Sequence, residues 1–150
     1  MLHSRTIPAH AWRRNLTGSA AMLFSEDRDI GEFAIRRYGP EGIQVNEVTY
    51  AGTLLLTPER LQDTGLPATL EAIDAGCLDA WLQEGPEILL LGTGDRVRFP
   101  SPHLIAHVQQ TGVGLEVMDT PAACRTWNIL ASERRRVVAV LFPIMIMGGE

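Results

Sequence analysis

Three apolar runs, two of them followed by helix-start signals, constrain the fold of this chain more than any other feature. Residues 87–91 form the first run, which ends at the turn Gly92-Thr93-Gly94. Residues 115–118 and 137–142 form the other two. Continuous hydrophobicity of this length is typical of strands buried on both faces of a sheet.

Each gap between these runs contains a hydroxyl residue directly before a proline. Ser101-Pro102 and Thr120-Pro121 are suited to be the N-cap and first residue of a helix. The arginine run 134–136 is expected to close the second helix. The order β-α-β-α-β predicts an α/β fold whose central sheet is mixed but mostly parallel, with flanking helices and right-handed crossovers. The strand ends near residues 92–94 and 117–120 should then lie side by side.

The first third of the chain is expected to be rich in β-structure. Residues 33–38, 43–45 and 48–50 alternate polar and apolar side chains around turn sequences, which predicts an N-terminal β-hairpin region. Residues 53–57 form a short apolar strand. A helix is predicted over residues 75–83, with Asp74 as its N-cap.

Composition narrows the possible functions. The chain has 150 residues and a formal charge of −5, and all 13 of its basic residues are arginine. Without lysine there is neither Schiff-base chemistry on a lysine side chain nor a P-loop. Arg5, Arg13 and Arg14 precede the first acidic residue, so the rest of the chain is acidic. No nucleic-acid partner is therefore expected.

Two cysteines without metal-site or disulfide spacing indicate a reducing compartment: the cytoplasm if the source is bacterial, or the mitochondrion if it is eukaryotic. The apolar stretch 137–147 is too short to span a bilayer, and Pro143 interrupts it, so no membrane insertion is expected. Residues 1–22 are predicted to be a flexible extension rather than a targeting peptide. Residues 23–150 are predicted to form a single domain.

Ligands of open α/β sheets bind outside the carboxyl ends of the strands. The candidate crevice residues there are Gly92, Thr93, Gly94, Asp119, Thr120, Arg125 and Asn128. A purely structural role in tight strand-to-helix turns is the favoured alternative. The third glycine of a dinucleotide fingerprint is missing, so neither a nicotinamide nor a flavin is expected, and no cofactor is assigned.

Other candidate chemistries are weaker. Cys124, in the first turn of a helix, is the best candidate nucleophile, although a small buried cysteine is favoured and no catalytic residue is assigned. His103 and His107 have helical metal-ligand spacing, but no third ligand is evident, and no metal site is expected. Trp127 is expected to lie in the core.

Several motifs together carry a family resemblance. They are LLLGTG (89–94), RFP (98–100), GVGLEVMDT (112–120), AACRTWNIL (122–130), Glu133 with RVVA (136–139), and upstream YG (38–39), IQVN (43–46) and YAGTLLL (50–56). Between about residues 23 and 143 the chain resembles the Mth938-like family of small uncharacterised domains, which includes a eukaryotic assembly factor of respiratory complex I. The resemblance implies a three-layer α/β fold. One departure is Trp127, where family members often carry tyrosine.

The resemblance supplies no catalytic residues, and it favours a non-catalytic protein-interaction or assembly module with a protein partner. The alternative is a small-molecule-binding protein or modest enzyme that uses the crevice. A thiol enzyme acting through Cys124 is a third hypothesis. The oligomeric state does not follow from the sequence.

Overall fold

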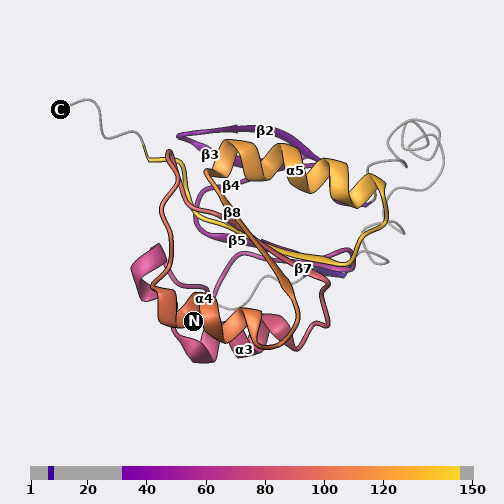
Figure 1. The fold of residues 1–150 in the computed structure, drawn as a ribbon. Helices are drawn as coiled ribbons and strands as arrows, with labels where there is room; N and C mark the ends of the chain where they lie inside the picture. Colours follow the sequence, from indigo (N-terminus) through magenta and orange to yellow (C-terminus); the bar gives the residue numbers. More distant parts are fainter. Residues whose placement is uncertain (1–6, 9–31, 146–150) are drawn as a thin grey trace.

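The computed structural model describes residues 7–8 and 32–145. Its main element is a six-stranded sheet, flanked by helices on both faces and by a small second sheet on one (Figure 1). In spatial order the strands are β1 (Ile7–Pro8), β6 (Arg60–Gln62), β5 (Leu54–Leu56), β9 (Val137–Leu141), β7 (Ile88–Gly92) and β8 (Gly114–Met118).

The six-stranded sheet is mixed, as predicted. Its α/β half is parallel, with β7 in the middle pairing with both β8 and β9. The other half is antiparallel, because β9 pairs with β5, β5 with β6, and β6 with β1. The prediction that the sheet is mostly parallel is therefore right only for the α/β half. Strand β6 was not predicted, since Pro58 indicated the end of a strand rather than a hairpin turn.

The expected N-terminal hairpin region forms a separate antiparallel sheet of β2 (Ile35–Gly39), β3 (Gly42–Val45) and β4 (Val48–Tyr50). Asn46 begins the turn between β3 and β4 with a positive φ of 55°. Its buried side chain accepts a hydrogen bond from the backbone N–H of Ala34 and donates to the carbonyl of Glu32. These bonds fix the chain that leads into β2.

The helical elements are η2 (Leu70–Ala72), α3 (Ala75–Leu82), α4 (Pro102–Gln109) and α5 (Thr120–Ser132). Helix α5 and the small sheet lie on one side of the six-stranded sheet, and α3 and α4 lie on the other (Figure 1). The resulting layers confirm the expected three-layer α/β architecture. Two apolar cores, one on each face of the sheet, hold the layers together.

The predicted helix starts are confirmed at two of three positions. Asp74 caps α3 by accepting a hydrogen bond from the Cys77 N–H, and Ser101 caps α4 with Pro102 directly after it. At α5 the predicted cap was wrong by one residue. Asp119 is the N-cap and accepts from the Ala122 N–H, which leaves Thr120 inside the first turn.

Two predictions concern the domain organisation of the whole chain, and the described residues test little of them. The flexible extension over residues 1–22 falls outside them, except at Ile7 and Pro8, which pair with β6. The single domain over residues 23–150 stays a prediction. Within the described part of the chain, no helix combines the length and apolarity needed to cross a membrane.

Candidate functional site

The structure brings the two predicted strand ends together. Gly92 at the end of β7 lies opposite Met118 at the end of β8. Beyond the strands, the Thr93 N–H donates to the Met118 carbonyl at 2.9 Å, and the Thr120 N–H donates to the Gly94 carbonyl at 2.8 Å. The two turns are therefore joined directly through their backbones.

The hydroxyl groups of the site bond within the protein. Thr120 is fully buried, and its Oγ1 accepts from the Gly94 N–H and donates to the Phe142 carbonyl, each at 2.8 Å. Oγ1 of Thr93 accepts from the Arg98 N–H at 3.0 Å and donates to the Arg96 carbonyl at 2.7 Å. Thr120 thus connects three segments, while Thr93 shapes the loop after β7.

Glycine is favoured at positions 92 and 94 of this turn for two different physical reasons. A Cβ on Gly92 would lie 3.0 Å from atoms of Ala123, Leu141 and Thr120, so the close packing of α5 on the sheet requires glycine there. Gly94 has a φ of +106°, a conformation that disfavours any side chain. Both glycines serve the tight turn from β7.

Two other candidate residues, Arg125 and Asn128, bond to the β2 strand and not to this turn. Arg125 donates from Nη1 to the Tyr38 hydroxyl at 2.8 Å, on the exposed surface between α5 and β2. Asn128 accepts from the Ile35 N–H and donates to the Ile35 carbonyl, each at 2.9 Å. The structure therefore does not bring Arg125 and Asn128 together with the strand-end residues, and Asn128 instead fastens β2 to α5.

Cys124 and Trp127 lie in the core, as favoured from the sequence. Cys124 is fully buried, and this burial raises the pKa of its thiol to about 12, against a weaker lowering by the nearby Arg125. A thiol with this pKa is protonated at neutral pH and is a poor nucleophile. Trp127 is also buried, and its indole N–H donates to the Phe33 carbonyl at 2.8 Å.

The two histidines of α4 have separate surroundings. Nε2 of His107 lies 2.8 Å from Oδ1 of Asp79 on α3, while His103 is exposed. Among the residues that the structure describes, no group of three or more histidine, cysteine, aspartate or glutamate side chains is placed to hold a metal ion.

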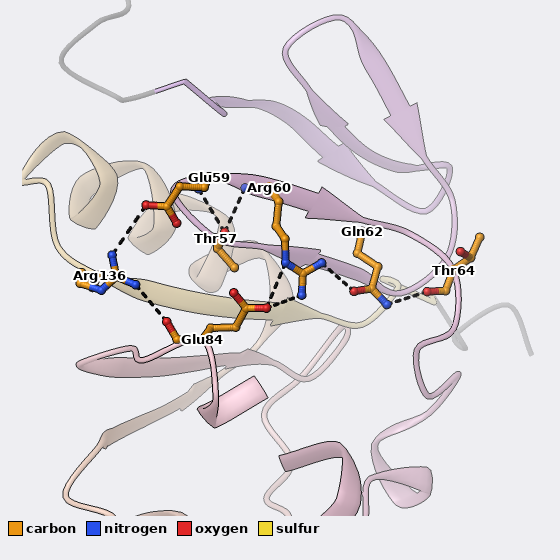
Figure 2. Close-up of polar contacts among 7 residues, drawn as sticks. All are labelled: Thr57, Glu59, Arg60, Gln62, Thr64, Glu84 and Arg136. Atoms are coloured by element: carbon orange, nitrogen blue, oxygen red, sulfur yellow. Dashed lines mark hydrogen bonds and ion pairs between the residues drawn. The ribbon is translucent and has the colours of Figure 1, made fainter. Parts of the chain in front are cut away.

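A polar network at the opposite end of β9 was missed by sequence reasoning (Figure 2). Arg60 on β6 forms an ion pair with Glu84. Arg136 donates from Nη2 to the Glu84 carbonyl at 2.9 Å, and its Nη1 lies 3.6 Å from Oε2 of Glu59. Arg136 therefore joins neighbouring turns instead of closing α5, which ends at Ser132. The sequence signal for this network is weak, because its charged residues Glu59, Arg60, Glu84 and Arg136 are spread over 78 positions of the chain.

A hollow of about 330 Å³ opens beside the loop that follows β7. Its lining residues are Leu70, Glu71, Ile73, Phe99, Pro100, Ser101 and Leu104. The ring of Phe99 on its border is 66% exposed, and the neighbouring Arg98 forms an ion pair with Glu71 at 2.8 Å. None of these lining residues was a candidate from the sequence.

The three layers, the mixed sheet and the joined strand ends define an α/β domain of the Mth938-like class. Residues 35–142 match the family described as "Protein of unknown function (DUF498/DUF598)". The chain belongs to this family. The match covers every described strand and helix except β1.

Solved structures support the same assignment. An NMR structure of a Xanthomonas campestris protein is 36% identical and superimposes with a TM-score of 0.68 over 73% of this chain and 83% of that one. A Bordetella pertussis protein, described as a Mth938-like domain, is 29% identical with a TM-score of 0.65 over 79% of this chain and 89% of its own.

A relative with a named role comes from Xenopus tropicalis. It is called NADH dehydrogenase [ubiquinone] 1 alpha subcomplex assembly factor 3 and is 35% identical over 120 residues, or 78% of this chain. The match spans 65% of that relative's own length, and it spans 60% of the human protein of the same name. The chain therefore corresponds to less than two thirds of these assembly factors.

Proposed function

We propose that this protein is a non-catalytic interaction module that assists the assembly of a respiratory NADH dehydrogenase. The observation that carries the proposal is the similarity to relatives named as assembly factors of that enzyme, 35% identical over 120 residues in the Xenopus protein. We place the protein in the bacterial cytoplasm or, for a eukaryotic source, in the mitochondrion.

The geometry of the strand ends supports a binding role over a catalytic one. The hydroxyls of Thr93 and Thr120 are occupied by backbone groups of the same chain. The Cys124 thiol is buried and protonated. The groups that would perform chemistry at this edge of the sheet therefore hold the fold together, whereas exposed side chains such as Phe99 and Tyr38 are available for contact.

The proposal is tested by deleting the gene in the native host and separating the respiratory complexes on native gels. The expected result is less assembled NADH dehydrogenase, with normal levels of the other respiratory complexes. A tagged full-length copy should restore the assembled enzyme and co-purify with some of its subunits. Unchanged NADH dehydrogenase in the deletion strain, together with a tagged chain that co-purifies with none of its subunits, would reject the proposal.

As a second candidate function we propose binding of a small molecule at the carboxyl edge of the parallel strands. It is favoured by the hollow of about 330 Å³, near the lower size of ligand pockets, which is lined in part by Phe99, Pro100 and Ser101 at the end of the loop that follows β7. Glu71, Phe99 and Leu104, which line the hollow, would border the ligand.

Thermal-shift screening with metabolites tests this second candidate. We expect a hit to raise the melting temperature of the wild type, and to do so much less in Phe99→Ala and Glu71→Ala, two residues that line the hollow. Each variant is compared with its own ligand-free baseline. An equal shift in all three proteins would place the ligand elsewhere.

A further inference from the structure

Strand β8 is an open edge of the six-stranded sheet. It pairs with β7 on one side, and within the described residues no strand lies on its other side. The strand at the opposite edge is the two-residue β1, which pairs with β6. In Figure 1, β8 crosses in front of the other strands of the sheet. An open edge presents unpaired backbone groups to any extended segment that approaches it.

The hydrogen bonds to β7 show which backbone groups face outward. The Gly114 N–H donates to the Glu87 carbonyl, and the Met118 carbonyl accepts from the Thr93 N–H, both at 2.9 Å. Alternate residues of a parallel strand direct both of their backbone groups to the same side. Leu115 and Val117 therefore direct theirs away from β7, where no described residue bonds them.

The side chains of β8 present a defined pattern at this edge. Leu115 and Val117 are half-buried and pack on the α4 side of the sheet. Glu116 points to the other face, is exposed, and forms no ion pair or hydrogen bond with any described residue. An added strand would complete the cover of the two apolar side chains and would meet the carboxylate of Glu116.

We infer that an extended segment of a partner protein adds to β8, with a basic residue opposite Glu116 and apolar residues on either side of it. This inference rests on the proposed interaction role and names its surface. Opposite charges directly across two strands are stabilising, and like charges are destabilising. The single carboxylate at the centre of the edge therefore selects for a cation.

The same charge argues against a second copy of this chain as the occupant. An antiparallel β8–β8 pair that used the outward groups of Leu115 and Val117 on both chains would be centred on Glu116. The two Glu116 residues would then form a pair without hydrogen bonds, the closest kind in a sheet, with Cα atoms about 4.5 Å apart. Their repulsion disfavours this pairing.

The experiment uses the full chain, labelled with ¹⁵N, and the acetylated peptide Thr-Thr-Val-Arg-Val-Thr-Thr at millimolar concentration. The expected result is that amide exchange slows by roughly tenfold or more at Leu115 and Val117, while the β7-bonded Glu116 amide is unaffected. The peptide with glutamate in place of arginine should bind at least about threefold more weakly. If exchange at Leu115 and Val117 is unchanged by the arginine peptide, the inference is wrong.

Variants at one position provide the matched control. Val117→Pro removes an outward N–H that β7 does not use, whereas Val117→Ala keeps it and shortens the side chain. We expect Val117→Pro to abolish the protection of Leu115 by the peptide and Val117→Ala to retain it, with urea unfolding used to show that both variants fold. Protection of Leu115 that persists in a folded Val117→Pro protein would overturn the inference.

The peptide assay is independent of the test of the proposed function. A chain that protects its β8 edge with the arginine peptide but does not affect NADH dehydrogenase assembly would reject only the proposed function. If the chain assists assembly but the peptide does not change amide exchange at Leu115 and Val117, only the inference of strand addition at β8 is rejected.

Discussion

Replacing the Thr120 hydroxyl tests whether the joined strand ends are held by the bonds described above. Thr120→Val keeps the size of the side chain and removes its oxygen. Two groups then lose their partner: the Gly94 N–H and the Phe142 carbonyl, each 2.8 Å from Oγ1. Because Thr120 is 0% exposed, bulk water cannot reach these two groups and replace the lost hydroxyl as their partner.

The size of the effect follows from these two losses. A buried donor or acceptor left without a partner costs about 1–3 kcal/mol. We therefore expect Thr120→Val to lower the free energy of unfolding by about 3 kcal/mol. Thr120→Ser keeps the hydroxyl and loses one methyl group, which should cost about 1 kcal/mol.

Urea unfolding followed by circular dichroism measures both losses, with the m-value showing whether the transition stays two-state. The control is Thr111→Val, which removes an exposed hydroxyl bonded to the Val108 carbonyl and should change stability by no more than about 0.5 kcal/mol. A Thr120→Val loss no larger than that of Thr111→Val would refute the structural role of this hydroxyl.

Two further predictions concern α5. Burial raises the pKa of Cys124 in the folded chain to about 12, above the value of about 8.5 for a free thiol. The protonated Cys124 therefore contributes fully to the free energy of unfolding below about pH 8.5, and this contribution is lost as the pH rises toward 12. Urea unfolding between pH 8 and 11 should show a fall of up to about 1.4 kcal/mol per pH unit that is absent in Cys124→Ala; equal slopes in both proteins would contradict it. Asn128→Asp removes the donor to the Ile35 carbonyl and should cost about 2 kcal/mol, against almost nothing for the exposed Ser132→Ala on the same helix. Similar losses in these two variants would show that Asn128 does not fasten β2.

Much of the α/β half of the fold could be predicted because its signals are local. The apolar runs that became β7, β8 and β9, and the cap at Ser101, depend on neighbours within a few residues. Strand β6 had no such signal, since its three residues form a strand only because β5 is there to pair with them.

The candidate site shows the same division. The sequence by itself determined that residues 92–94 and 117–120 meet, because parallel strands joined by a helix place their carboxyl ends together. Only the tertiary structure decided what the polar groups there contact. The partner of Thr120 is 22 residues further along the chain, and the partner of Asn128 is 93 residues before it. Such distant contacts are fixed by how the layers pack, and a single sequence carries no local signal for them.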